Sequence, residues 1–217
     1  MTQQPLSTVR RKATMYAGLG SAVAGTVAGA VFAAQWFSGV WNGTPYPVAV
    51  PAATAQRLDE RTQAVYDELG LSHATLDRDW PGGMDAGGYD CHPVGLRHFF
   101  DNLRDTPTSE PQVVDVHNDW ALKGVSLDEA VPALERVRAA LTGRGWTVTE
   151  YRRTPSLLEM RLKAPGGSDR VTIESYPGNR LQVAASADCA RYPAGTPLDS
   201  AGNPRLPSPQ APSVLRG

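Results

Sequence analysis

The chain has 217 residues, enough for one or two domains, and its 41% hydrophobic and 20% charged residues are typical of a folded protein. The formal net charge of −1 hides an asymmetry, because the only charges in residues 1–12 are Arg10, Arg11 and Lys12. Without these three, 18 basic side chains face 22 acidic ones. Nucleic-acid binding depends on neutralising phosphates, so a domain of this charge excludes nucleic acid as an expected partner.

Residues 13–34 form an uncharged segment of 22 residues, which as a helix would span roughly 33 Å, enough for the ~30 Å hydrocarbon core of a bilayer. The basic residues precede it, and Trp36, Phe37 and Trp41 follow where an interfacial aromatic belt would lie. We therefore predict a cytoplasmic tail at 1–12, a single transmembrane helix with its aromatic interface at 13–41, and an extracytoplasmic remainder.

The alternative for this segment is a signal peptide that is cleaved after Ala33, which would release a secreted protein. The length of the apolar run favours the anchor, because it exceeds the ~7–15 residues of a signal-peptide core. Within the helix, small residues recur every fourth position and form a stripe that would allow self-association in the membrane, although chance produces such spacing in an Ala/Gly-rich helix. The stripe consists of Ser21, Gly25, Gly29 and Ala33.

The expected extracytoplasmic part begins with a proline-bearing linker at 42–53 and continues as one domain over 54–192. A helix is predicted from Pro51 or Thr54 to Leu69, with Gly70 as its C-terminal cap. Residues 71–90 lack periodicity and are expected to be a loop. A short helix is predicted near residues 93–104. Its apolar spacing is carried by Leu96, Phe99, Phe100 and Leu103.

Alternation in residues 111–124 predicts a half-buried strand, and Ser126 with Glu129 predicts a capping box that opens a helix ending at Gly143 or Gly145. Four further strands are expected, at 146–152, 157–163, 171–176 and 181–187. The order predicts an α+β fold, with a mostly antiparallel sheet of about five strands and its helices on one face.

Two further features concern the end of the domain. Cys91 and Cys189 both fall on the expected outer side, where oxidising conditions favour disulfides, so we predict a bridge between them. Residues 193–217 contain six prolines and no hydrophobic period, which predicts a disordered or loosely attached tail.

Candidate chemistry is sparse. Asp115, His117 and Asp119 share one face of the strand at 111–124, a spacing that can supply metal ligands, but a solvated outer face is the favoured interpretation. Asp77 and Asp79 begin a sequence like a calcium loop, which then departs from that pattern. The sequence holds no nucleophile elbow, phosphate-binding glycine loop or zinc-protease motif, so we expect no cofactor and disfavour an enzyme.

The sheet face without helices is a second candidate surface, because exposed Tyr and Arg are enriched at protein interfaces. A solvated face is again the favoured interpretation, since antiparallel sheets often face water on one side. The residues predicted on this face are Thr147, Thr149, Tyr151, Glu159, Arg161, Glu174, Tyr176 and Gln182.

The strings GWTVTEYRR, LEMRLKAP and RVTIESYPGNRLQVAASADCARYPAGTP, together with the basic N-terminus and apolar segment, resemble uncharacterised membrane-anchored or secreted proteins of actinobacteria. The likeness covers roughly residues 90–200. It implies the same extracytoplasmic architecture and no catalytic residues. The leading hypothesis is a membrane-tethered, non-catalytic domain for an envelope or protein partner. The alternatives are a secreted protein, or a metal-binding or enzymatic domain using Asp115, His117 and Asp119.

Overall fold

The computed structural model of the protein describes residues 36–216. The uncharged residues 13–34 of the predicted membrane span lie outside these residues, as does the small-residue stripe, while residues 36–41 of its aromatic interface lie inside. Within the described part of the chain, no helix has both the length and the hydropathy needed to cross a bilayer.

The contacts divide the chain into two units. The first, called here the loop unit, comprises residues 1–45 and 93–107 and is described from residue 36 onward. The second, called the sheet domain, comprises residues 46–92 and 108–217 and holds the large core.

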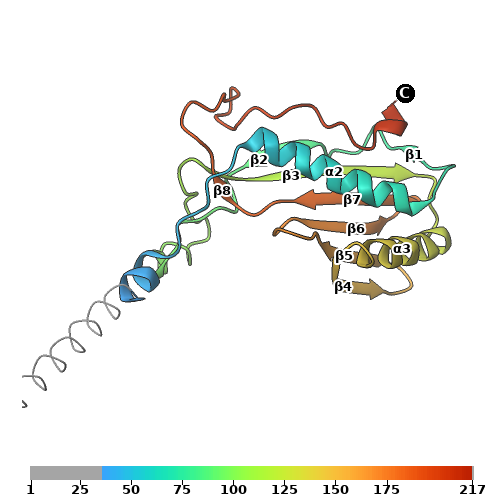
Figure 1. Cartoon of the computed structure of the whole chain (residues 1–217), viewed down its shortest axis with the longest axis horizontal. Helices are drawn as coiled ribbons and strands as arrows, with labels where there is room; N and C mark the ends of the chain where they lie inside the picture. The colour runs from blue at the N-terminus through green and yellow to red at the C-terminus, as the bar shows by residue number, and fades with distance from the viewer. Residues whose placement is uncertain (1–35, 217) are drawn as a thin grey trace, which may run out of the picture. The chain divides into compact units, whose positions relative to one another are not determined.

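The sheet domain is an α+β fold built on one eight-stranded sheet (Figure 1). The order of its main path is β1-β3-β7-β6-β5-β4, and the short strands β2 and β8 also pair with β3. Every pairing between these strands is antiparallel, as the sequence predicts. Its elements are α2 (Pro51–Leu69), β1 (Thr75–Leu76), β2 (Met84–Gly87), β3 (Val113–Lys123), α3 (Leu127–Thr142), β4 (Thr147–Arg153), β5 (Leu158–Lys163), β6 (Arg170–Tyr176), β7 (Arg180–Ser186), β8 (Ala190–Arg191) and the 3-10 helix η2 (Ser213–Arg216).

Both long helices pack on the same face of the sheet, α2 over β3 and β7 and α3 over β4, β5 and β6 (Figure 1). The core lies between the helices and this face, because alternate residues of each strand point toward it. Leu122, Ile173 and Val183 are fully buried there, and burying a side chain of this kind contributes roughly 1.5–3 kcal/mol.

Helix α2 follows from its sequence pattern. Pro51 occupies the first turn, where no intrahelical donor is lost, and Gly70 ends the helix in the left-handed conformation at φ 61°. Leu58, Val65 and Leu69 form the buried stripe. The predicted helix is therefore confirmed, with its start inside the expected linker.

Helix α3 is also confirmed with its cap. The backbone N–H of Ser126 donates to the Glu129 carboxylate at 3.0 Å, completing the capping box. Pro132 lies inside the helix near its start, where few intrahelical bonds are lost. Strands β4 to β7 match the predicted strands within one residue at each end.

Four predictions about the described residues were wrong. Residues 71–90 are not all loop, because β1 and β2 pair with β3, and the sheet therefore has more than five strands. These strands are two and four residues long, too short for a visible period of two.

The predicted helix near 93–104 is replaced by turns and the three-residue 3-10 helix η1 (Leu96–His98). Gly95 adopts φ 98°, which an α-helix does not allow. The apolar spacing was misleading because Leu96, Phe99, Phe100 and Leu103 are all exposed, so no core stabilises a helix here.

Tyr151 does not lie on the open face. A register shift between Val148 and Glu150 places Tyr151 opposite the buried Met160. A bulge of this kind adds one residue to a strand and reverses the side-chain alternation beyond it. Glu150 and Arg152 take the positions on the open face, opposite Arg161 and Glu159.

The C-terminal residues make specific contacts, where a disordered tail was expected. The backbone N–H of Arg205 donates to the carbonyl of Pro197 at 2.9 Å, and that of Ser213 donates to Gln63 of α2 at 3.1 Å. Ala211 is buried. The end of the chain is therefore bound along α2.

Candidate functional site

The three predicted ligands share the open face of β3 but are divided between two interactions. His117 Nε2 lies 2.5 Å from the carboxylate of Asp115, and this hydrogen bond raises the pKa of His117 above its ordinary value. Asp119 instead accepts hydrogen bonds from Trp80 Nε1 at 3.1 Å and Gln182 Nε2 at 2.8 Å. Burial nevertheless raises the pKa of Asp119.

These partners leave little capacity for a metal. Among residues 36–216, no group of three or more His, Cys, Asp or Glu side chains could hold a metal ion. In the sequence that begins like a calcium loop, Asp77 is buried and pairs with Arg180 at 2.7 Å, while Asp79 donates its backbone N–H to Asp77 at 3.2 Å. The loop is therefore held by internal contacts.

The open face carries an ion-pair network across β4 and β5. Glu159 is only 2% exposed and lies between Arg152 and Arg161, whose Nε is 2.6 Å from it. Glu150 completes the square, at 2.8 Å from Arg152 and 3.1 Å from Arg161. Two carboxylates and two guanidinium groups thus compensate each other, which is typical of a structural network rather than a reactive site.

Next to this network, Glu174 lies opposite Glu159 on the neighbouring strand. Burial raises the pKa of Glu174, and the charge of Glu159 raises it further. Tyr176 follows on the same strand and packs edge-to-face on Trp80, with ring centroids 5.2 Å apart. This face is well connected internally, and a small cavity beside Trp80 borders it.

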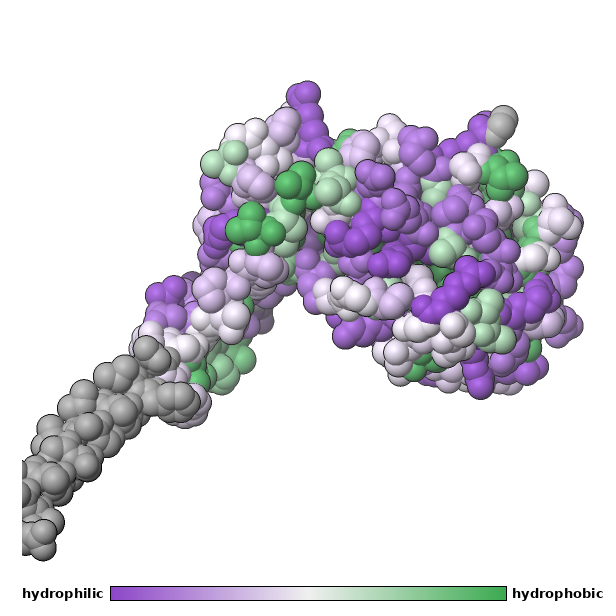
Figure 2. Space-filling view, in the orientation of Figure 1, coloured by the Kyte–Doolittle hydropathy of each residue, from purple (hydrophilic) through white to green (hydrophobic). Residues whose placement is uncertain are grey.

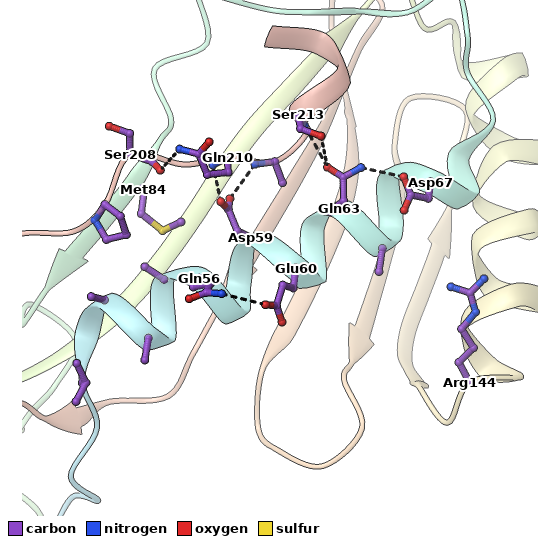
Figure 3. Close-up of a pocket in the computed structure, with 17 residues that line it drawn as sticks. Gln56, Asp59, Glu60, Gln63, Asp67, Met84, Arg144, Ser208, Gln210 and Ser213 are labelled. Atoms are coloured by element: carbon purple, nitrogen blue, oxygen red, sulfur yellow. Dashed lines mark hydrogen bonds between the residues drawn. The ribbon is translucent and has the colours of Figure 1, made fainter.

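A wider recess of the sheet domain lies elsewhere, between the outer side of α2 and the C-terminal segment, defined here as residues 207–213 (Figure 3). Its volume is about 940 Å³. Small side chains of α2 line one wall, including Ala52, Ala53 and Ala64. Pro207 and Met84 contribute to the other side. We call this recess the α2 groove.

Asp59 holds the C-terminal segment, which forms the far wall of the α2 groove, opposite α2 itself. It is buried, and its carboxylate accepts hydrogen bonds from the backbone N–H groups of Gln210 and Ala211 (Figure 3). On its other side it accepts from Asn118 Nδ2 at 2.8 Å. Thr62 joins the same buried cluster at 3.3 Å from Asn118.

The rim of the α2 groove is acidic. Exposed Glu60 and Asp67 project from α2 and accept hydrogen bonds only from the neutral side chains of Gln56 and Gln63, at 3.5 and 2.8 Å, among the described contacts. Arg144 is the single basic residue lining the groove, and it is already paired with Glu68. The groove thus combines an apolar interior with a negative rim.

Sequence reasoning did not identify the α2 groove. The available signal was Asp59 and Thr62, polar residues on the buried stripe of a helix, since buried polar groups require partners. Those partners come from Asn118 and from residues about 150 positions later, a proximity that no local pattern reveals.

The disulfide was identified correctly. Cys91 and Cys189 are bonded, and Cys91 is fully buried. The bridge joins the chain before residue 93 to the segment between β7 and β8, closing a separation of 98 residues. It holds both segments at one end of the sheet domain.

Comparison with known proteins adds little. No protein family model and no curated protein matches the chain. Among solved structures, the putative lipoprotein LppA from Mycobacterium tuberculosis is similar, with 13% identity, a TM-score of 0.35, and coverage of 65% of this chain and 78% of LppA. A likeness this distant does not bear on function.

Proposed function

We propose that the protein is a membrane-tethered extracytoplasmic binding domain, and that its α2 groove takes an extended, basic segment of a partner protein in the cell envelope. The observation that carries the proposal is the groove itself, an apolar recess of about 940 Å³ with an acidic rim.

The tether is supported by the sequence. The uncharged residues 13–34 are long enough to span a bilayer, and the three basic residues before them favour a cytoplasmic N-terminus. The disulfide between Cys91 and Cys189 is compatible with an oxidising compartment outside the membrane.

The choice of a peptide segment is supported by the C-terminal segment. Pro207 to Ser213 already runs along α2 with its backbone N–H groups bound to Asp59 and Gln63. Side chains of α2 can therefore bind an extended backbone, and the groove leaves room beside it for a second one.

The preference for basic residues follows from charge. Among the described residues, neither Glu60 nor Asp67 forms an ion pair, although the charge of Glu60 also acts on Arg57, which is paired with Asp169. A partner that supplies Lys or Arg would therefore complement these two carboxylates. The small side chains of Ala52 and Ala53 allow a backbone to approach the helix closely, which suits a segment with small apolar residues.

The test uses the full chain in detergent and a fluorescein-labelled peptide of alternating alanine and lysine with proline spacers, which stays extended. We expect saturable binding by fluorescence anisotropy, and roughly tenfold weaker binding by the double variant Glu60→Lys, Asp67→Lys. A peptide with glutamate in place of lysine should not bind.

The control is Asp128→Lys, which reverses one acidic charge on the exposed side of α3, outside the groove. It should bind the peptide like the wild type. An equal loss with Asp128→Lys, or no saturable binding by the wild type, would refute the assignment of the groove.

A further inference from the structure

The loop unit exposes many large apolar side chains for so few described residues. In the helical residues 36–42 these are Trp36, Phe37, Val40 and Trp41, and Phe37 stacks on Trp41 with ring centroids 6.0 Å apart. In the segment 93–107, here called the apolar loop, they are Leu96, Phe99, Phe100 and Leu103. Figure 2 shows a hydrophobic patch in this unit.

The apolar loop is packed tightly against the end of residues 36–42. A Cβ atom on Gly95 would lie 2.5 Å from the carbonyl oxygen of Trp41, and one on Gly43 would lie 2.6 Å from the nitrogen of Gly95. Arg97 donates to Asn42 at 3.1 Å. The loop is therefore fixed to the chain close to Trp41.

We propose that the apolar loop is a second membrane contact, which inserts Leu96, Phe99, Phe100 and Leu103 into the interface of the bilayer beside the anchor. The inference rests on the proposed tether, because the occupant is the bilayer that residues 13–34 would span. It goes beyond the tether in assigning a lipid-binding role to a segment more than 50 residues further along the chain.

The position of the loop is the reason for choosing lipid over a protein partner. Trp41 lies only seven residues after the end of the predicted span, at the level expected for the aromatic belt. The apolar loop packs against Trp41. Its exposed phenylalanines therefore lie close to the residues that are expected to meet the lipid headgroups. Phe and Leu with nearby Arg97 and Arg104 are the residue types that suit this interface.

The four large apolar side chains of the apolar loop are exposed to solvent, and this exposure also needs an explanation. Phe100 is 81% exposed, and the described residues of its unit include no element that covers it. Single exposed apolar side chains are common on protein surfaces, but a contiguous group of them marks an interaction site.

The test places a photoreactive benzoylphenylalanine at position 100 of the full chain, reconstituted in vesicles of phosphatidylethanolamine and phosphatidylglycerol in equal amounts. The matched control places it at Tyr89, an aromatic residue of the sheet domain with a similar exposure of 78%. We expect several-fold more lipid adduct, measured by mass spectrometry, from position 100 than from position 89.

The outcomes separate the loop contact from the tether. A chain that floats with the vesicles but forms equal adducts at both positions, or adducts with protein alone, would overturn the loop contact and leave the tether standing. A chain that does not float would overturn both. A double variant, Phe99→Ser with Phe100→Ser, should still float but show faster amide exchange in the apolar loop than the wild type in vesicles.

Discussion

The carboxylate of Asp59 accepts the backbone N–H of Ala211 at 3.1 Å, linking the first helix of the sheet domain to the end of the chain. The two residues are 152 positions apart. Asp59 also binds Gln210 and Asn118, so one buried side chain connects α2, β3 and the C-terminal segment. The far wall of the α2 groove depends on this residue.

Replacing Asp59 with alanine should release the C-terminal segment. Buried N–H groups would lose their acceptor, which lowers the free energy of unfolding by about 1–3 kcal/mol. Urea unfolding measures this loss. Trypsin should also cut after Arg205 faster than in the wild type, as seen by intact mass.

The control for this change is Asp199→Ala. Asp199 also accepts backbone N–H groups, from Ala201 and Asn203, but only within its own turn. The Asp199→Ala variant should leave the free energy of unfolding nearly unchanged. If Asp59→Ala behaved like Asp199→Ala, the C-terminal segment would not be held by α2.

Glu159→Gln tests the ion-pair network of the open face. The amide cannot balance Arg152 and Arg161, and we expect a loss of roughly 1–3 kcal/mol in the free energy of unfolding. The same variant should lower the pKa of Glu174, because the charge of Glu159 helps to raise it. A titration of Glu174 by NMR would show this, and an unchanged pKa would contradict the predicted coupling.

The pair of His117 and Asp115 predicts a pH dependence of stability. The pKa of His117 is raised in the folded state, chiefly by the hydrogen bond to Asp115 and also by the charges of Asp85 and Asp90, against desolvation. A raised folded pKa gives stability that is present at mildly acidic pH below the ordinary value of 6.5 and is lost as pH rises through the folded pKa.

The comparison of the wild type with Asp115→Asn measures this contribution. The wild type should be more stable at mildly acidic pH, with the difference shrinking as the pH rises above neutrality, and an NMR titration should give a lower pKa for His117 in the variant. The effect is modest because the His117 side chain is 46% exposed and solvent screens the pair. A difference that grows with pH would contradict the assignment.

The disulfide predicts a large redox effect on stability. Cys91 and Cys189 are separated by 98 residues, and the chain-entropy model gives up to ~4–5 kcal/mol for a loop of this size. Urea unfolding of the double variant Cys91→Ser, Cys189→Ser should show most of this loss. Wild type after complete reduction should resemble the variant, and equal stability of all three would exclude a stabilising bridge.

Regular elements were predictable because their signals are local. The capping residues Ser126 and Glu129, the C-terminal Gly70 and the alternation in β5 to β7 each depend on a few neighbouring residues. The disulfide followed from the count of two cysteines and the expected compartment.

What the sequence did not reveal depends on distant contacts. The bulge near Thr149 moves Tyr151 to the core side, although the letters alternate regularly. The exposed Phe99 and Phe100 have the spacing of a buried helix but no core to cover. The role of Asp59 could be recognised only from the structure, which shows its carboxylate accepting a hydrogen bond from the backbone N–H of Ala211.

The most direct test of the central claim is the intact mass of the native protein under non-reducing conditions, taken separately from membrane and culture-fluid fractions. The account predicts a full-length species in the membrane fraction, two hydrogens lighter than the fully reduced chain because of the bridge between Cys91 and Cys189. A soluble species that begins near Ala34 would contradict the tether, and with it the membrane contact of the apolar loop.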